Sequence, residues 1–130
     1  MDARPLKGNN AVAAALRSPL RLSSGPLAVT IGFTEAPSSQ LSYVVSASRR
    51  VIRRAVVRNR IKRLLREALR RSVRLHGTQY AAAGLSTVFA VWRTPPAASM
   101  RLRLSDVEPH VQSLLRRASA GAQPSNVQPS

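Results

Sequence analysis

The residues of this chain best suited to chemistry are arginines, and they are concentrated in one stretch of the sequence. The basic and amide residues of that stretch are Arg49, Arg50, Arg53, Arg54, Arg58, Asn59, Arg60, Lys62, Arg63, Arg66 and Arg70. A guanidinium group binds phosphate through paired hydrogen bonds and also stacks on bases. The whole sequence holds 21 basic and 5 acidic residues, a formal charge of +16, and a domain with such an excess is usually held near a polyanion. Nucleic acid is therefore the first candidate partner.

The residue types that protein catalysts use are few in this sequence. Its carboxylates are Asp2, Glu35, Glu67, Asp106 and Glu108. They are too scattered to indicate a metal site or a general acid and base pair. His76 and His110 have no partner at ligand spacing, and there is no cysteine, which fits a reducing compartment. We therefore predict no catalytic residue, no metal site and no cofactor bound by the protein itself.

The basic stretch is predicted to lie on one long helix. From about Ala55 to Leu75 the sequence has no glycine or proline, and Gly77 follows as a stop signal. The apolar residues that recur at helical spacing are Ile61, Leu64, Leu65, Ala68, Leu69 and Leu75. They form one arc, so the opposite face is almost entirely basic, with Glu67 placed to pair with Arg63 or Arg71. Like charges at this spacing repel one another, so we expect a partner outside the chain to compensate them.

Several shorter segments are predicted to be strands. Alternating apolar residues indicate strands at Leu27 to Phe33 and at Leu41 to Ala47. A β-branched and aromatic run indicates another at Thr87 to Trp92. A further strand is expected either in Leu20 to Leu22 or at Arg49 to Ile52.

Two more helices are expected near the ends of the chain. Asn9 and Asn10 can cap a short helix that runs to about Leu16, and a capping box from Ser105 to Glu108 opens a last helix through Arg117. The prediction is a single α+β domain, with a small, mainly antiparallel sheet and three helices in the order α-β-β-β-α-β-α. We expect residues 1–5 to be a flexible N-terminus, residues 6–118 to be the domain and residues 119–130 to be a disordered tail.

The segment from Ser46 to Glu67 resembles the signature of the bacterial ribonuclease P protein component. Its centre is Arg58-Asn59-Arg60, followed by Ile61-Lys62-Arg63 and Arg66-Glu67, on a helix that follows a strand. The order of the other elements is similar to that of the family from about Leu6 to Ala118. The resemblance implies a non-catalytic protein subunit of a ribonucleoprotein endoribonuclease that removes the 5′ leader of precursor tRNA. Catalysis would be carried by the RNA subunit, with Mg²⁺ held mainly by RNA and one protein per RNA.

The resemblance also implies roles for individual residues. Those facing the catalytic RNA would be Arg58, Asn59, Arg60, Lys62 and Arg66, with Arg63 and Arg70 as neighbours and with Arg49, Arg50, Arg53 and Arg54 as an extension. In the family, the 5′ leader lies in a groove between the first helix and the sheet, and the parallel strands around the long helix form a left-handed crossover, against the usual rule. The groove residues here would be Ala11, Ala15, Tyr43 and Val45. Ala11 and Ala15 stand where the family usually has aromatic residues, so leader binding is expected to differ.

Two other functions are alternatives to this one. A general structured-RNA-binding module, similar to a ribosomal protein, would use the same basic face on any phosphate backbone. A membrane-surface helix is disfavoured because the apolar arc of the long helix is needed by the sheet. The sequence has no signal-peptide pattern and no apolar run long enough to span a membrane, so we predict a cytoplasmic protein without a membrane partner.

Overall fold

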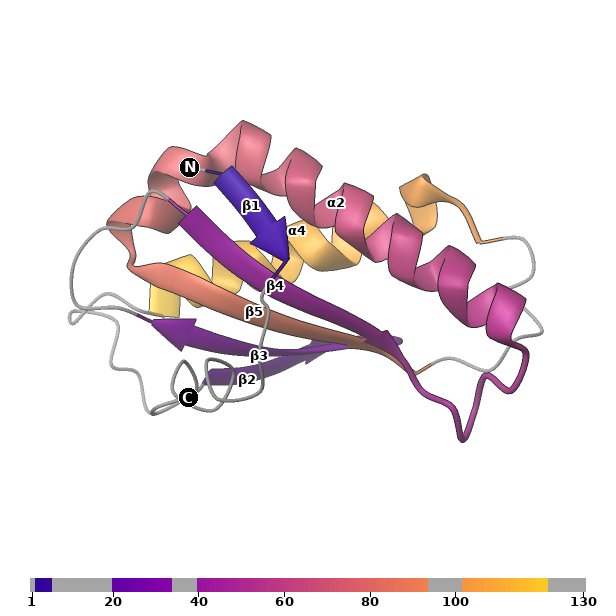
Figure 1. Ribbon diagram of the computed structural model, residues 1–130. Helices are drawn as coiled ribbons and strands as arrows, with labels where there is room; N and C mark the ends of the chain where they lie inside the picture. Colours follow the sequence, from indigo (N-terminus) through magenta and orange to yellow (C-terminus); the bar gives the residue numbers. More distant parts are fainter. Residues whose placement is uncertain (1, 6–19, 34–39, 94–101, 122–130) are drawn as a thin grey trace.

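The computed structural model describes residues 2–5, 20–33, 40–93 and 102–121. Within these residues the chain forms five strands and two helices (Figure 1). In chain order they are β1 (Asp2–Pro5), β2 (Leu20–Ser24), β3 (Leu27–Phe33), β4 (Gln40–Ala47), α2 (Ala55–Ala82), β5 (Leu85–Trp92) and α4 (Leu104–Gly121). The prediction of one α+β domain is confirmed. The expected first helix, with Ala11 and Ala15, lies outside the described residues, as does the chain after residue 121.

The five strands form one mixed sheet in the order β1-β4-β5-β3-β2. Strand β4 pairs in parallel with both β1 and β5, whereas β3 pairs antiparallel with β5 and β2. The prediction of a mainly antiparallel sheet was therefore wrong. Helix α2 carries the chain back along the sheet between β4 and β5, and such a crossover connection makes the two strands parallel. The hand of this crossover stays a prediction.

Strand β1 was not predicted, because residues 1–5 were expected to be flexible. Ala3 and Pro5 instead lie opposite Leu41 and Tyr43 in the parallel register with β4. Ala3 is half-buried against the core. Four residues that include two charges and a proline have no apolar alternation, so the sequence alone gives no sign of this strand. Its position is set by pairing with a segment far along the chain.

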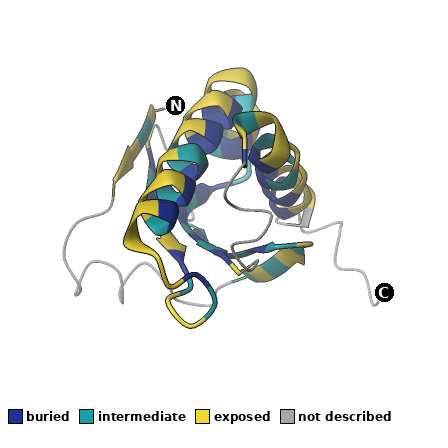
Figure 2. Ribbon diagram, turned by 90° about the vertical axis from the view of Figure 1, so that its right-hand side faces the viewer, coloured by how far each residue is buried: buried dark blue, intermediate teal, exposed yellow. Residues whose placement is uncertain are grey.

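Both helices lie on the same face of the sheet and cover it (Figure 2). The register places Leu27, Val29 and Ile31 of β3 opposite Trp92, Ala90 and Val88 of β5, with every one of these side chains buried toward the helices. Helix α2 contributes the buried residues Ile61, Leu65, Ala68 and Leu69, and α4 contributes Val107, Val111, Leu114 and Leu115. The core therefore occupies the layer between the sheet and the two helices, and it fixes which face of α2 points outward.

Helix α2 does not stop at Gly77, as predicted, but continues to Ala82. The helix is kinked at His76, which has a φ of −128° and a ψ of 16°, and Gly77 is buried within it. Beyond the kink, Tyr80 is fully buried and its hydroxyl shares a 2.7 Å hydrogen bond with Ser72 Oγ. Burying an aromatic ring outweighs the cost of about 1 kcal/mol for a glycine in a helix. The left-handed residue that ends this region is Gly84, with a φ of 83°.

Burial also changes the ionisation of Tyr80. Removal of its hydroxyl from water raises the pKa of Tyr80 above 10, and the opposing effects of the Ser72 hydrogen bond and the Arg116 charge are smaller. The ring therefore anchors the last turn of α2 in its neutral form over the ordinary pH range.

The structure also differs from the prediction at one residue of α2 and at both ends of α4. Leu75 was assigned to the apolar arc of α2 but is 63% exposed. The predicted capping box from Ser105 to Glu108 does not form: α4 begins at Leu104, and the carboxylate of Asp106 accepts a 2.9 Å hydrogen bond from the backbone N–H of Arg103. Helix α4 also includes residues 119–121, and Ser119 is buried, so the expected disordered tail does not begin at residue 119.

Candidate nucleic-acid interface

The predicted RNA-binding residues lie on the part of α2 that is not packed against the core, including the edge of the helix beside β4, and on the turn that precedes it. We call this surface the basic face; in the structure it comprises Arg53, Arg54, Arg58, Asn59, Arg60, Lys62, Arg63, Arg66, Arg70 and Arg74, with Arg49 and Arg50 in the turn after β4. Arg58, Lys62 and Arg66 are half-buried, and the others are exposed. Figure 2 shows that α2 is exposed on its outer side and buried on the side that meets the core. The packing of α2 on the core thus leaves all of these side chains on the surface around this helix.

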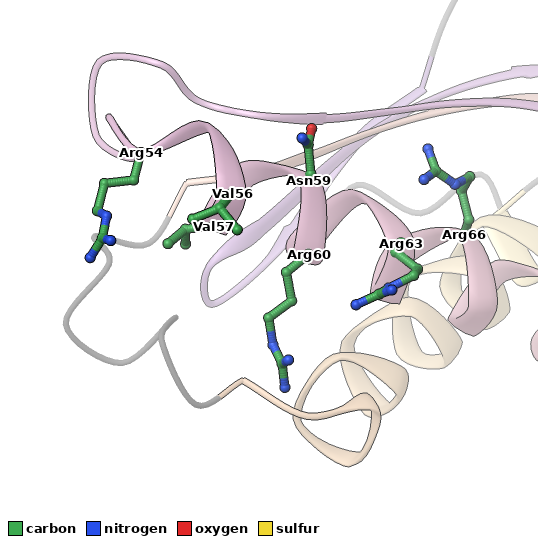
Figure 3. A pocket seen from close by; sticks show the side chains of 7 residues that line it. All are labelled: Arg54, Val56, Val57, Asn59, Arg60, Arg63 and Arg66. Carbon is green, nitrogen blue, oxygen red and sulfur yellow. The ribbon is translucent and has the colours of Figure 1, made fainter.

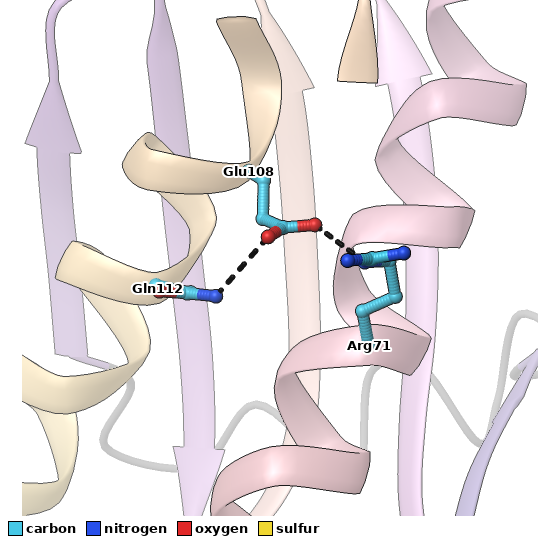
Figure 4. Close-up of polar contacts among 3 residues, drawn as sticks. All are labelled: Arg71, Glu108 and Gln112. Atoms are coloured by element: carbon cyan, nitrogen blue, oxygen red, sulfur yellow. Dashed lines mark hydrogen bonds and ion pairs between the residues drawn. The ribbon is translucent and has the colours of Figure 1, made fainter. Parts of the chain in front are cut away.

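The charges of the basic face are not neutralised by carboxylates within the described residues. The ion pair found there joins Arg71 Nε to Glu108 Oε2 at 2.6 Å, and Gln112 Nε2 donates a 3.5 Å hydrogen bond to the other oxygen of Glu108 (Figure 4). The predicted pairing of Glu67 with Arg71 is wrong, because α4 brings Glu108 to Arg71 instead. Glu67 is exposed and forms no ion pair with the described residues. The basic face therefore keeps its repulsive charge density.

Arg58 holds the basic turn in place. Its Nη1 donates hydrogen bonds of 2.9 Å to the carbonyl of Ile52 and 2.7 Å to the carbonyl of Arg53. Ile52 is fully buried, and its own N–H donates to the carbonyl of Ser48 at 2.8 Å. These contacts close the turn on the end of α2, so Arg49 and Arg50 are displayed next to the helix. No pattern in the sequence predicts this internal role for Arg58.

Arg60 connects α2 to the segment that leads into α4. Its Nε and Nη2 donate hydrogen bonds of 3.2 Å and 2.8 Å to the same carbonyl, that of Leu102. Because Leu102 is distant in sequence, no local pattern predicts this contact. Carbonyl groups accept hydrogen bonds without cancelling charge, so these contacts fix the positions of Arg58 and Arg60 without neutralising the basic face.

Hollows accompany the basic face along its length. A cavity of about 530 Å³ is lined by Arg54, Val56, Val57, Asn59, Arg60, Arg63 and Arg66 (Figure 3). A second, of about 430 Å³, lies toward β4 and is lined by Val45, Ser46, Ala47, Ser48, Arg49, Arg58, Asn59 and Lys62. A third, of about 320 Å³, lies beside β1 and is lined by Asp2, Ala3, Arg4, Arg70, Val73 and Arg74. The basic face is therefore a ridge with a hollow on each flank. Such a shape fits a folded polyanion better than a flat surface does.

Comparison with known proteins shows the family of this chain. The family model described as ribonuclease P matches residues 2–119. The chain belongs to the ribonuclease P protein family. This chain is thus the protein subunit of an endoribonuclease ribonucleoprotein that acts in tRNA processing. The predicted family is confirmed.

The solved structures that resemble this ribonuclease P protein share its fold at low sequence identity. A Staphylococcus aureus RNase P protein has 14% identity and a TM-score of 0.59, with 88% of this chain and 94% of that chain covered. A second structure of the Staphylococcus aureus protein has 16% identity and a TM-score of 0.58, covering 88% of each chain. A mutant of the protein with defective mRNA degradation activity has 16% identity and a TM-score of 0.56, covering 88% of this chain and 86% of that one. The search of curated proteins found no match.

The described part of the predicted leader groove does not lie as the ribonuclease P resemblance implied. Tyr43 is 2% exposed, on the helix-covered face of the sheet, so it is a core residue rather than a groove residue. Val45 is half-buried on the same side and lines the hollow beside Lys62. The strand alternation instead turns Ser42 and Val44 toward the opposite face, where Val44 lies beside Phe89 of β5. The prediction placed the groove on the wrong face of β4, because both faces of this strand carry apolar residues.

The described residues of the ribonuclease P protein contain no group of three or more side chains of the kinds that ligate metal ions. The carboxylates on α4 already have partners, since Glu108 pairs with Arg71 and Asp106 caps the helix. In the same parts of the chain, neither helix has the length and apolarity needed to cross a membrane.

Proposed function

We propose that the basic face of α2 is the surface that binds ribonuclease P RNA, and that the protein also contacts the 5′ leader of precursor tRNA. The observation that carries this proposal is the unneutralised positive charge of the face. Cations three and four residues apart on a helix repel one another by a few tenths of a kcal/mol per pair. An RNA backbone removes that repulsion and releases its own counterions on binding.

The contribution of the protein to the reaction would be to position RNA and neutralise its charge. Mg²⁺ would be held mainly by RNA phosphates, and the cleavage step would belong to the RNA subunit. This division is supported by the engagement of Glu108 and Asp106 within the fold. We also expect one protein per RNA and a cytoplasmic site of action.

The leader would lie on the sheet face opposite the helices rather than against Tyr43. The register places Thr30, Phe89 and Val44 in one row across β3, β5 and β4 on that face. Phe89 is half-buried, so part of its ring is open to contact. A single-stranded base stacked on an aromatic ring gains about 1 to 3 kcal/mol. Phe89 would therefore supply the stacking that Ala11 and Ala15 do not.

The test is a double charge reversal on the basic face, Arg63→Glu with Arg66→Glu. Neither side chain makes a hydrogen bond to the described residues, so the fold should be retained. The matched control is Arg93→Glu with Arg116→Glu, which removes the same charge from exposed positions elsewhere. We expect the first pair to abolish binding to ribonuclease P RNA and 5′ processing at physiological Mg²⁺, while the control loses little.

Circular dichroism must show both double variants to be folded. An unrelated structured RNA of equal length serves as competitor, and it should displace the ribonuclease P RNA poorly. Equal losses in the two double variants would contradict the proposal, because they would show that only the net charge matters.

A further inference from the structure

One apolar side chain lies at the start of the basic face. Val56 is 67% exposed, in the first turn of α2. It precedes Arg60 by four residues and Arg63 by seven, so all three lie on the same side of the helix. A single exposed apolar residue is ordinary on a protein surface. Val56 is unusual because it lies among exposed arginines.

Val56 is the exposed apolar residue that lines the cavity of about 530 Å³ described above, and Val57, which also lines it, is 5% exposed. In Figure 3, Arg54, Arg60 and Arg63 extend from the same side of α2 as the two valines, and Asn59 and Arg66 lie along the other edge. The wall of this cavity is mainly apolar, whereas the walls of the hollows beside Lys62 and Arg70 are mainly polar. Its volume falls within the range of about 300 to 1,000 Å³ that is common for ligand sites.

The guanidinium of Arg60 is held rigidly at this cavity. Its Nε and Nη2 both donate to the carbonyl of Leu102, which fixes the plane of the group. A fixed guanidinium plane is a platform on which a base can stack, and its remaining N–H groups are still available to a phosphate. Holding Arg60 before RNA arrives also lowers the entropy lost on binding.

A phosphate group gains no binding energy from contact with an apolar wall. The ligand that combines a flat, weakly polar ring with negative charge is a nucleotide whose base has left its stack, and proteins that recognise RNA commonly bind such bases. The side-chain amide of Asn59 provides a donor and an acceptor for the edge of a base. An apolar peptide would match the valines but not the four guanidinium groups around them.

We propose that this cavity takes one unstacked nucleotide of the bound RNA, with the base against Val56 and the plane of Arg60 and with its phosphates near Arg54 and Arg63. The proposal rests on the proposed function, since it names what one part of the basic face recognises. The nucleotide site and the phosphate contacts of the basic face differ in how their contributions to affinity depend on salt. Contact between a base and Val56 releases no counterions, so its contribution to affinity does not change with salt concentration.

The test is Val56→Ala, with Leu75→Ala as matched control. Leu75 is also on α2, is 63% exposed and lies outside this cavity. Alanine favours a helix more than valine does, so the substitution should not unfold α2. The dissociation constant for ribonuclease P RNA is measured over a series of salt concentrations. We expect Val56→Ala to bind about fivefold to tenfold more weakly, from the loss of two methyl groups, with the slope of log K against log salt unchanged.

A third variant, Arg63→Gln, separates this proposal from the proposed function. It should reduce the magnitude of the slope by about 0.7 to 0.9, the value for one phosphate contact. If Val56→Ala binds within about twofold of wild type, or if its slope changes, the nucleotide site is refuted while the function stands. If Arg63→Gln leaves both slope and affinity unchanged, the proposed function is itself contradicted.

Chemical probing gives an independent readout on the RNA. Dimethyl sulfate should modify at least one unpaired base in free ribonuclease P RNA that wild-type protein protects. We expect Val56→Thr, which keeps the shape of the side chain but adds a hydroxyl, to restore that modification at protein concentrations that saturate the RNA. Protection of the same bases by wild type and by Val56→Thr would overturn the proposal.

Discussion

Replacement of Arg58 by glutamine tests whether this arginine acts mainly inside the protein. Arg58 Nη1 donates hydrogen bonds of 2.9 Å and 2.7 Å to the carbonyls of Ile52 and Arg53, and these bonds close the turn that displays Arg49 and Arg50. Arg58→Gln shortens the side chain and removes its charge, so both bonds are lost. We expect a protein that folds to the same structure but is measurably less stable.

The magnitude follows from the two bonds and their surroundings. A hydrogen bond from a charged donor contributes about 1.5 to 3 kcal/mol where water is excluded. One of the two bonds of Arg58 is partly buried and the other is exposed. We therefore expect a loss of about 1 to 2 kcal/mol in the free energy of unfolding. With a urea dependence of about 2 kcal/mol per molar, the unfolding midpoint should fall by about 0.5 to 1 M.

Arg66→Gln is the matched control for this change. Arg66 is also half-buried on α2 and makes no hydrogen bond to the described residues. Its neighbours four residues away are Lys62 and Arg70, as those of Arg58 are Arg54 and Lys62. Arg66 also has Arg63 three residues away, so the relief of charge repulsion is at least as large in Arg66→Gln as in Arg58→Gln. Urea unfolding followed by circular dichroism measures the difference, and equal midpoints for the two variants would refute the internal role of Arg58.

Three further changes test other parts of the fold. Burial raises the pKa of Tyr80, so at a pH above about 10 the unfolded chain loses this proton before the folded chain does, and stability falls as the pH rises. The advantage of wild type over Tyr80→Phe in urea unfolding should therefore shrink from pH 8 to pH 11. A constant difference would contradict the burial of the neutral hydroxyl. Glu108→Gln breaks a partly exposed ion pair with Arg71 and should cost about 1 kcal/mol or less, without weakening RNA binding; a loss above about 2 kcal/mol would show that the pair is more than a surface contact. Gly25→Ala places a Cβ at a residue with a φ of +55° and 3.2 Å from His110 Cε1, so it should destabilise by about 1 to 2 kcal/mol and lower the Tm; an unchanged Tm would be inconsistent with that conformation.

The elements that the sequence predicted well are those with a local pattern. Strand β3 was predicted from Leu27 to Phe33 and has those bounds, because its residues alternate between a buried and an open face. Helix α2 begins at Ala55, as predicted, and its basic face follows from the spacing of apolar residues such as Ile61 and Leu65. One of the two alternatives for an early strand is confirmed as β2, whereas residues 49–51 form a turn.

What the sequence could not show depends on contacts between distant residues. Strand β1 exists because β4 offers it an edge, and the extension of α2 beyond Gly77 depends on the burial of Tyr80. At the site, Arg60 looked like any other cation, and only the fold brings the carbonyl of Leu102 to it. Val56 was overlooked because one apolar residue among arginines makes no periodic pattern.

The two outer strands of the sheet bear on how the protein behaves when many copies are crowded together. An open strand edge is a template for pairing with another chain, and long, apolar edges lead to aggregates. Here β1 has four residues, with Arg4 exposed and Pro5 lacking an N–H, and β2 has five residues, with Arg21 exposed. Such short and charged edges are poor templates. Several copies attracted to neighbouring RNA molecules can therefore become concentrated without joining their sheets, so the protein stays available for assembly.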